Sequence, residues 1–435
     1  MYFALVDCNN FFVSCERAFQ PDLEGKAVVV LSNNDGCIVA RSNESKAMGI
    51  KMGTPIFKVK NLVDSGKLIV RSSNYTLYGD LSARVMSILR EYAPELQVYS
   101  IDEAFMVFDG IALDKVIEIS KDVVLKIRKW VGLPVSVGIA QTKTLAKIAN
   151  HFAKKYPGYK GVCCIENEEK RKKALSLTPI DDVWGIGWRG APKLMAIGVK
   201  TALDFAEKRE EWVRKRMGVT GVRTWLELRG TAAVGDEAKE RRQTICTSRS
   251  FADMIEDPDE LTLRISDFAG ICAKKLRQEG SLASTVGLFM QTNRFREDLD
   301  QYYPQASLSL DTPSSSTTEI VGAALKIMKG IFRKGYKYKR AGVIVMDIIA
   351  ADELQGSLFD ENSALREKED KISEIMDSVN GNGRNLLRLA VQRAGHYADG
   401  IRSEHLSKRY STSWDEMIEV HRPLSTSSTT GAISS

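Results

Sequence analysis

Two kinds of apolar pattern follow each other along the first 165 residues. Continuous apolar runs, which are typical of buried strands, occupy residues 2–8, 27–31, 98–108 and 134–140. Apolar residues at helical spacing predict helices over residues 9–19, 42–48, 81–92 and 113–131. An Asp-Gly pair between two apolar runs predicts a hairpin over residues 33–40. Strands and helices in alternation predict an α/β domain built on one sheet.

The composition and pattern of the chain change twice after this domain. Residues 142–160 are basic and helical, and glycines at 185, 187 and 198 predict a helix-hairpin-helix. A polar, small-residue stretch over 230–243 reads as a linker. The pattern then predicts a compact α+β unit with strands at 244–251, 283–291, 307–310 and 340–349 and helices at 261–277 and 316–332. After Asp352 the periodicity fades, and the Ser/Thr-rich end from Leu424 is typical of disorder.

Length and composition point to a multidomain protein of the cytoplasm. A chain of 435 residues predicts roughly three domains at about 150 residues each. No uncharged apolar run reaches the roughly 18 residues of a membrane span, so no membrane partner is expected. The first seven residues lack a basic region and end on Asp7, which argues against a secretory signal. The seven cysteines include no C-x-x-C pair, which argues against a disulfide framework and a structural zinc site.

Two adjacent carboxylates, Asp102 and Glu103, interrupt an apolar run. Such a pair on a half-buried strand persists where cations, protons or strong donors compensate it, whereas two solvated acids at a strand edge need no such partner. On this stretch alone the two interpretations have equal weight. Asp7 ends the first strand, and neighbouring strands about 4.8 Å apart would bring three carboxylates together. Oxygen ligands favour Mg²⁺, and two such ions support nucleotidyl transfer.

The residues around these acids carry a family resemblance. The segments 7–16 and 99–105 resemble the two acidic motifs of the Y-family translesion DNA polymerases, most closely those of the bacterial UmuC type. Further matching segments lie at residues 30–37, 72–75, 138–147 and 182–187, so that the resemblance covers almost the whole chain.

The resemblance implies the multidomain α/β and α+β fold of a right-hand polymerase. The palm would comprise residues 1–25 and 76–165, and the remaining parts would be fingers at 26–75, a helix-hairpin-helix thumb at 166–235, a linker at 236–242, an α+β little finger at 243–351 and a tail at 352–435. The implied function is error-prone, template-directed DNA synthesis past damaged bases in an SOS-type damage response. The reaction would be two-metal transfer from a dNTP to a primer 3′-hydroxyl.

The resemblance also assigns the centre of the site. Asp7, Asp102 and Glu103 would be the catalytic acids and would hold two Mg²⁺ ions, with the Cys8 carbonyl as a further ligand. Phe12, five residues after Asp7, would be the steric gate, a ring that leaves no room for a ribose 2′-hydroxyl. A core phenylalanine is the alternative for Phe12.

Two lysines would contact the incoming triphosphate, Lys46 from the fingers and Lys154 from the palm. The alternative for each is an ordinary solvated lysine. This chain departs from many relatives upstream of Lys46. Ala40 and Asn43 stand where those relatives have hydroxyl residues.

The expected DNA contacts come from two regions. Backbone N–H groups at a helix-hairpin-helix turn bind phosphate without reading a base. The segment 329–340 interleaves basic and aromatic residues and contains no acid, which suits phosphate tracking, although a solvated charge run is the plainer interpretation. The DNA-binding residues expected are Gly185, Gly187, Lys193, Arg249, Lys337 and Lys339.

Two segments near the C-terminus predict protein partners. Gln355, Leu358 and Phe359 resemble the sliding-clamp-binding peptide of bacterial polymerases, and residues 406–414 resemble the C-terminal region of UmuC-type members. The family resemblance implies a UmuD′ dimer and RecA as partners, beside primer–template DNA and dNTP.

The sequence is compatible with two other classes of function. One is a non-catalytic DNA-binding scaffold that retains the polymerase fold. The other is a two-metal nuclease or nucleotidyl cyclase on a similar palm. The acid trio argues against the scaffold, and Phe12 with the helix-hairpin-helix favours the polymerase.

Overall fold

The computed structural model describes residues 1–235, 242–353, 363–380, 387, 389–392 and 402–419. The chain forms two compact units. One comprises Met1–Lys239 and Glu404–Ser435, and the other comprises Glu240–Ser403. The predicted clamp-binding residues Gln355, Leu358 and Phe359 lie outside the described residues.

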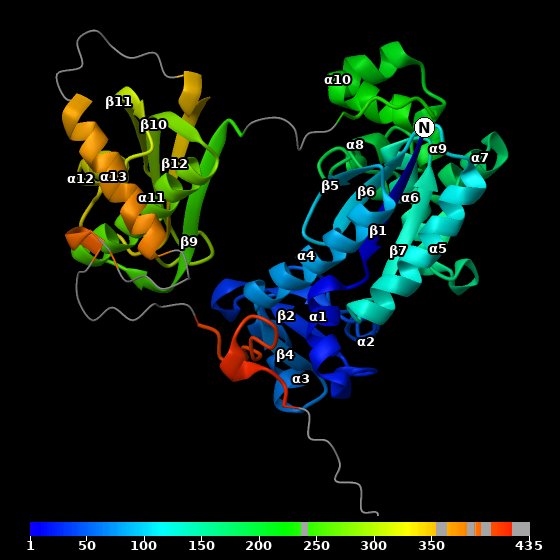
Figure 1. The fold of residues 1–435 in the computed structure, drawn as a ribbon, viewed down its shortest axis with the longest axis horizontal. Coiled ribbons are helices and arrows are strands. Elements are labelled where there is room, and N and C mark those ends of the chain that lie inside the picture. Colours follow the sequence, from blue (N-terminus) through cyan, green and yellow to red (C-terminus); the bar gives the residue numbers. More distant parts are fainter. Residues whose placement is uncertain (236–241, 354–362, 381–386, 388, 393–401, 420–435) are drawn as a thin grey trace, which may run out of the picture. The chain divides into compact units, whose positions relative to one another are not determined.

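A five-stranded sheet forms the centre of the first unit (Figure 1). Its strand order is β5 (Glu95–Val98), β6 (Glu103–Phe108), β1 (Tyr2–Cys8), β7 (Val135–Ala140) and β8 (Val162–Cys164). The central strand β1 runs antiparallel to both of its neighbours. Phe3 and Leu5 face one hydrophobic core, whereas Ala4 and Val6 face the other. Burial on both faces explains why β1 is a continuous apolar run rather than an alternating one.

Helices cover both faces of this sheet. The helices α4 (Tyr75–Tyr92) and α5 (Leu113–Trp130) contribute to the core on one face, and α6 (Lys143–Lys155) contributes to the core on the other. Side chains of Asn74 and Thr142 accept hydrogen bonds from the first turns of α4 and α6, which fixes where these helices begin. A Cβ atom at Gly138 would lie 2.1 Å from a carbonyl oxygen of α6, so glycine allows α6 to approach β7 closely.

A smaller three-stranded sheet follows the first helix, α1 (Phe11–Phe19). Its order is β3 (Ile38–Arg41), β2 (Val28–Leu31) and β4 (Ile69–Ser72), and the short helices α2 (Asn43–Ala47) and α3 (Lys60–Asp64) accompany it. The strands β2 and β3 are antiparallel, which confirms the hairpin predicted from the Asp-Gly pair. The parallel strand β4 was not predicted from the sequence.

Four further helices join the first unit. They are α7 (Glu168–Leu177), α8 (Ala191–Met195), α9 (Ala202–Ala206) and α10 (Glu210–Leu228), and their apolar residues extend the core beneath α6. Gly185 and Gly198 precede and follow α8 with positive φ angles of 92° and 84°. At Gly185 a Cβ atom would also lie 2.4 Å from the Thr224 hydroxyl, so this turn requires glycine.

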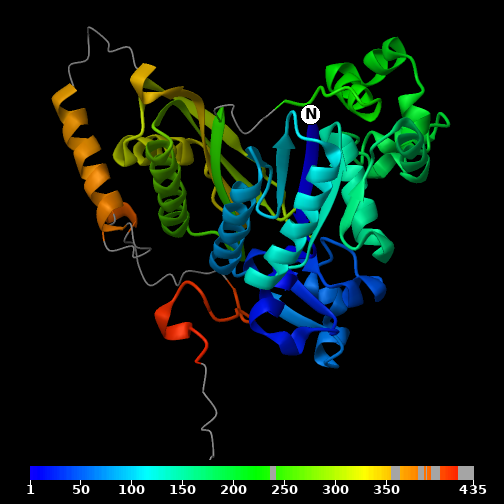
Figure 2. The same ribbon diagram turned by 45° about the vertical axis from the view of Figure 1, so that its right-hand side comes forward.

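The second unit is the predicted α+β unit. Its antiparallel sheet has the order β11 (Gln305–Ser314), β10 (Ser281–Thr292), β12 (Tyr338–Ala350) and β9 (Thr244–Ile255). Its helices are α11 (Pro258–Gln278), α12 (Thr317–Ile331) and α13 (Ser363–Val379). Residues of α11 and α12 share one hydrophobic core with the sheet. The helix α13 lies where the sequence predicted fading periodicity (Figure 2).

The prediction of one strand over residues 98–108 is wrong. The chain reverses between β5 and β6, and the N–H groups of Tyr99 and Ser100 both donate to the Glu103 carbonyl at 3.0 Å. The Ser100 hydroxyl accepts from the N–H groups of Asp102 and Glu103 at 3.3 and 3.1 Å. A serine that binds the backbone in this way stabilises a turn, which overrides the apolar pattern on either side.

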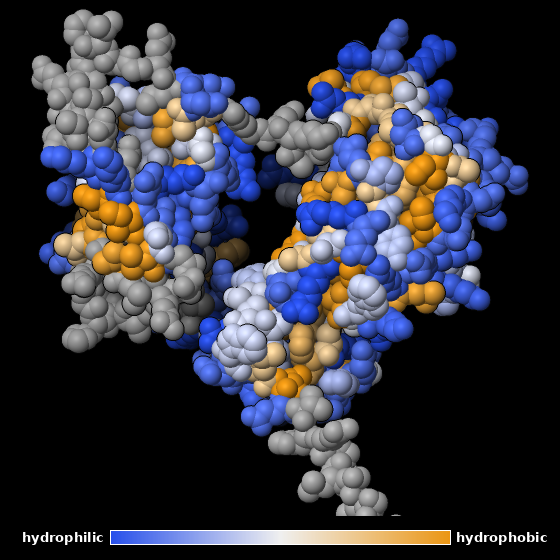
Figure 3. Space-filling view, in the orientation of Figure 1, coloured by the Kyte–Doolittle hydropathy of each residue, from blue (hydrophilic) through white to orange (hydrophobic). Residues whose placement is uncertain are grey.

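Hydrophilic residues cover most of the visible surface of each unit, with smaller hydrophobic areas between them (Figure 3). No described helix combines the length and the apolar composition that a membrane crossing demands. All seven cysteines are free thiols, as their spacing predicted.

Candidate active site

Strand register brings Asp7 beside Glu103. The two residues are direct partners in the antiparallel pairing of β1 and β6, and Asp7 is paired with Ser136 of β7 on its other side. Asp7 is 8% exposed, so its carboxyl group sits in an almost closed site. The expectation that these two acidic strands are neighbours is confirmed.

Asp102 is held beside them by its backbone. Its carbonyl accepts a hydrogen bond from the Cys8 N–H at 2.9 Å, at the end of β1. Its side-chain Oδ1 accepts from the Ser100 hydroxyl at 2.5 Å. Of the three predicted carboxylates, Asp7 and Glu103 therefore meet, whereas the carboxylate of Asp102 is engaged by the turn.

Two lysines of α6 neutralise the acidic pair. Lys154 Nζ lies 2.6 Å from Asp7 Oδ1, and Lys147 Nζ lies 2.7 Å from Glu103 Oε2. Burial raises the pKa of Asp7 to about 7, with a contribution from Glu103 and against the attraction of Lys154. Burial also acts to raise the pKa of Glu103, but hydrogen bonds from Asp7 and Lys147 outweigh it and lower that pKa. Asp7 is therefore the group that retains a proton near neutral pH.

The sequence predictions included Lys154 but omitted Lys147. The Lys147 ammonium also lies over the rings of Tyr99 and Trp184, 4.4 and 5.3 Å from their centroids. Lys147 and Lys154 are seven residues apart and thus lie on one face of α6, the spacing that would have identified the pair.

The donor chemistry of the pair suits a hard divalent cation. Carboxylate oxygens are preferred ligands of Mg²⁺, and each of the two acids already attracts an ammonium group. Among the described residues, no three His, Cys, Asp or Glu side chains are arranged as a metal site in this conformation. A metal at this site would replace the ammonium groups that now contact Asp7 and Glu103.

Phe12 lies on α1, and its side chain is partly exposed. Its ring stacks on Tyr78 with centroids 4.5 Å apart and an interplanar angle of 15°, and Tyr75 meets it edge-on at 5.9 Å. The neighbouring Phe11 is buried at 4% exposure and belongs to the core, as expected. Of the two rings, Phe12 is therefore the more accessible.

Lys46 reaches the turn that connects β1 to α1. Its ammonium donates to Asn10 Oδ1 at 2.5 Å, and the Asn10 amide donates to Asn43 Oδ1 at 3.1 Å. Burial lowers the pKa of Lys46, and the positive charges of Arg41 and Lys154 add to this effect. Asn43 therefore helps to orient Asn10, whereas Ala40 is a buried residue of β3.

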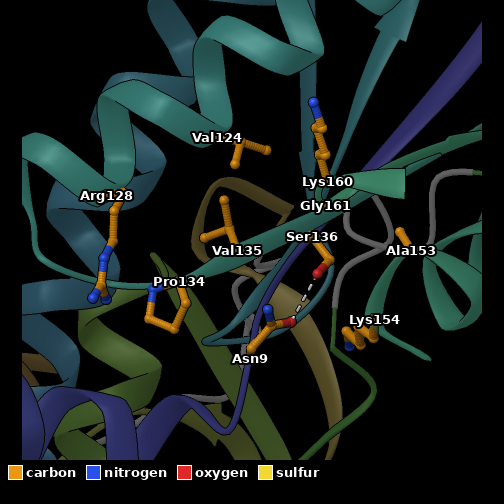
Figure 4. Close-up of a pocket in the computed structure, with 10 residues that line it drawn as sticks. All are labelled: Asn9, Val124, Arg128, Pro134, Val135, Ser136, Ala153, Lys154, Lys160 and Gly161. Carbon is orange, nitrogen blue, oxygen red and sulfur yellow. Dashed lines mark hydrogen bonds between the residues drawn. The ribbon is translucent and has the colours of Figure 1, made fainter. Parts of the chain in front are cut away.

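A pocket of about 280 Å³ is lined in part by Lys154, the partner of Asp7 (Figure 4). The Ser136 hydroxyl donates to Asn9 Oδ1 at 3.1 Å on its wall. The pocket has three basic lining residues, and its full lining is Asn9, Val124, Arg128, Pro134, Val135, Ser136, Ala153, Lys154, Lys160 and Gly161. These charges favour an anionic occupant.

The predicted DNA contacts are distributed over the two units. In the first unit, Gly185 and Gly187 lie in the turn before α8, and Lys193 is an exposed residue of that helix. In the second unit, Arg249 is an exposed residue of β9. Exposure leaves the side chains of Lys193 and Arg249 accessible to phosphate.

Two predicted lysines of the second unit have partners already. Lys337 Nζ lies 3.0 Å from Glu256 Oε1 at the surface, whereas Lys339 Nζ donates to the Ala252 carbonyl at 2.9 Å. Burial lowers the pKa of Lys339. Lys337 is therefore the better placed of the two for phosphate binding, because its partner is solvated and exchangeable.

The sequence matches two models of the impB/mucB/samB family. The family model matches residues 6–151, and the model of the family's C-terminal domain matches residues 242–358. A domain of unknown function matches residues 370–420.

Curated relatives are similar over nearly the whole chain. Protein UmuC of Salmonella typhimurium is 39% identical over 422 residues, which cover 96% of this chain and 100% of the relative. Protein MucB of Escherichia coli is 36% identical over 414 residues, covering 95% and 98%. DNA polymerase IV of Bacillus velezensis is 27% identical over 394 residues, covering 88% and 91%.

The fold is similar to solved polymerase structures. A Y-family DNA polymerase chimera of Dbh and Dpo4 has a TM-score of 0.64 at 21% identity, covering 80% of this chain and 100% of the chimera. An insertion ternary complex of Dbh DNA polymerase has a TM-score of 0.56 with the same identity and coverage. At these identities the likeness concerns the fold alone, and it confirms the polymerase fold that the sequence predicted.

Proposed function

The chain belongs to the impB/mucB/samB family of Y-family DNA polymerases, and we propose that it synthesises DNA past damaged bases at the site around Asp7 and Glu103. The reaction is the template-directed attack of a primer 3′-hydroxyl on the α-phosphate of a dNTP, within an SOS-type damage response. In this proposal the five-stranded sheet is the palm, the β3-β2-β4 sheet belongs to the fingers, α7 to α10 form the thumb, and the second unit is the little finger.

The observation that carries the site assignment is the register of β1 and β6. It pairs two acids of low exposure that stand 96 positions apart, since Asp7 faces Glu103. Asp102 follows at the adjacent backbone position through its bond with the Cys8 N–H. Lys154 and Lys147 supply one ammonium group to each of the two acids.

The acids would hold two Mg²⁺ ions, with Asp7, Asp102, Glu103 and the Cys8 carbonyl as ligands. Such ions lower the pKa of an attacking hydroxyl and stabilise the leaving pyrophosphate. Asp7 has to give up its proton and its contact with Lys154 before it can act as a full ligand. Lys154 is then available to the triphosphate, beside the basic pocket that it lines.

The neighbouring residues would position the nucleotide. Lys46 presents a cation at the turn between β1 and α1. Phe12 presents a partly exposed ring backed by Tyr78, which supports its role as the gate against a ribose 2′-hydroxyl. The substrates are accordingly dNTP and primer–template DNA.

The wider set of partners follows from family resemblance. A sliding clamp would bind through Gln355, Leu358 and Phe359, and a UmuD′ dimer and RecA would complete the assembly. The DNA would be held by the phosphate contacts expected around Gly185, Gly187, Lys193, Arg249 and Lys337.

Primer extension on undamaged and abasic templates tests the proposal. Wild-type protein should extend the primer with Mg²⁺, and Asp102→Ala should not, while an exposed carboxylate variant such as Asp64→Asn should match the wild type. Equal extension by wild type and Asp102→Ala would point to a non-catalytic scaffold, which nothing in the comparisons favours. Cut DNA or a cyclic nucleotide without primer growth would point to the nuclease or cyclase.

A further inference from the structure

The segment 404–419 packs against the first unit although it is the last described part of the chain. The Ser72 N–H donates to the His405 carbonyl at 3.0 Å, and the His405 N–H donates to the Ser72 hydroxyl at 3.0 Å, so that the segment lies along the end of β4. Tyr410 stacks on Phe19 at the end of α1, with centroids 4.9 Å apart and an interplanar angle of 3°. This contact joins the C-terminal segment to the helix that carries Phe12.

Asn74 fixes the position of Ser407 within this segment. The Asn74 amide donates to the Ser407 hydroxyl at 3.0 Å and to the Lys408 carbonyl at 3.2 Å. The carbonyl of the same side chain caps α4. Asn74 and Ser407 are 3% and 8% exposed, so water does not compete for these bonds.

Ser407 also donates to the buried carboxyl group of Glu16. Glu16 is fully buried, and its Oε1 accepts from the Tyr78 hydroxyl at 2.6 Å and from the Ser407 hydroxyl at 3.1 Å. Its Oε2 has no hydrogen-bond partner within the described ranges. Burial raises the pKa of Glu16, and the bonds from Tyr78 and Ser407 oppose this effect. Both donors therefore stabilise a group that is costly to bury.

The geometry of α1 connects Glu16 to the gate. Phe12 and Glu16 are four residues apart, so they lie one above the other on the same helix face. Tyr78 bridges them, because its hydroxyl binds Glu16 while its ring stacks on Phe12 at 4.5 Å. A shift of the Glu16 carboxyl group would move the Tyr78 ring and with it the support of Phe12.

We propose that Ser407 is a positioning residue for the Phe12 ring, acting through Glu16 and Tyr78, so that the docked C-terminal segment contributes to sugar selection. This inference rests on the proposed function, in which Phe12 is the gate. Without the Ser407 hydroxyl, the Glu16 carboxyl group keeps a single donor. The Phe12 ring then loses part of its backing and admits a ribose more readily.

Single-nucleotide incorporation by the full-length chain tests the inference. The readout is kcat/KM for a dNTP divided by kcat/KM for the matching rNTP. We expect Ser407→Ala to lower this ratio by about three- to tenfold, mainly through a lower KM for the rNTP, because small displacements of positioning groups have effects of this order or larger. Ser407→Thr keeps the hydroxyl and should retain the ratio. Thr412→Ala, at an exposed position of the same segment, is the matched control.

A double-mutant cycle distinguishes one connected path from separate effects. Tyr78→Phe keeps the ring but removes the donor to Glu16, and it should lower the ratio as Ser407→Ala does. The double variant should be no worse than the stronger single variant, since both changes interrupt the same path. Fully additive effects would overturn the inference.

The remaining outcomes separate the inference from the proposed function. If Phe12→Ala lowers the ratio and Ser407→Ala leaves it unchanged, the inference fails while the gate stands. If the wild type shows no template-dependent synthesis, the proposed function fails. A Ser407→Ala variant that loses dNTP and rNTP incorporation equally, with a lower unfolding midpoint, would show a merely structural role and would also overturn the inference.

Discussion

The substitution Asp7→Asn tests the electrostatic account of the site in metal-free protein. Burial raises the pKa of Asp7 from 3.8 to about 7 in the folded state. A folded-state pKa above the unfolded value means that the contribution to stability is fully present below about pH 4 and is lost as the pH rises through about 7. Asparagine has the shape of the protonated acid and cannot ionise, so the variant lacks this loss.

The size of the effect follows from the shift. Three pKa units at 1.36 kcal/mol each give a ceiling of about 4 kcal/mol for the ionisation of Asp7 on folding. Part of this titration is complete by pH 5. Between pH 5 and pH 8 we therefore expect wild-type protein to lose about 2 to 3 kcal/mol of unfolding free energy relative to Asp7→Asn.

Urea unfolding followed by tryptophan fluorescence in EDTA measures this difference. All six tryptophans lie in residues 1–239 and 404–435, so the signal reports the unit that contains Asp7. Mg²⁺ should stabilise the wild type at pH 8 by binding the folded state, and it should stabilise Asp7→Asn much less. Parallel pH profiles for wild type, Asp7→Asn and the exposed control Asp64→Asn would refute the reasoning.

Three further predictions concern the gate, the acids and DNA binding. Phe12→Ala should raise rNTP incorporation at least about tenfold in single-nucleotide assays, since removal of the ring opens space for the 2′-hydroxyl. Unchanged sugar discrimination would show that Phe12 is not the steric gate. Asp102→Ala should abolish primer extension while leaving the Kd for primer–template DNA in a gel-shift assay within about threefold of wild type, because phosphate contacts dominate affinity. Lys337→Ala should reduce the slope of log K for DNA binding against log salt concentration by about one. Lys339→Ala should leave this slope unchanged because the Lys339 ammonium binds the Ala252 carbonyl. Equal slopes for wild type and Lys337→Ala would show that Lys337 forms only its surface ion pair and does not contact phosphate.

The proximity of Asp7 to Glu103 was predictable because Asp7 ends one apolar run and Glu103 interrupts another. Strand neighbours place such residues side by side once the sheet forms. The direction of the Asp102 side chain was not predictable, because Ser100 determines it within a turn that the apolar pattern concealed. The engagement of Lys339 was hidden for a similar reason, since a basic segment does not reveal which ammonium group meets a backbone carbonyl.

The docking of residues 404–419 had no signal in the sequence. Ser407 and Tyr410 contact residues more than 300 positions away, and no periodicity marks either of them. The helix α13 was missed although its residues follow helical spacing over part of its length. Local propensity and hydrophobic periodicity do not predict long-range contacts of single polar residues.

The position of residues 404–419 also bears on the order in which this protein is made. Strand β1 and helix α1 leave the ribosome before the second unit, whereas the segment that covers the end of α1 leaves it after that unit. A chain cut short before Ser407 contains Asp7, Glu103 and Phe12 but lacks one of the two donors to Glu16. If Ser407 positions the Phe12 ring as proposed above, translation through Ser407 is a condition for sugar selection, and chains cut short before Ser407 should accept a ribonucleotide more readily.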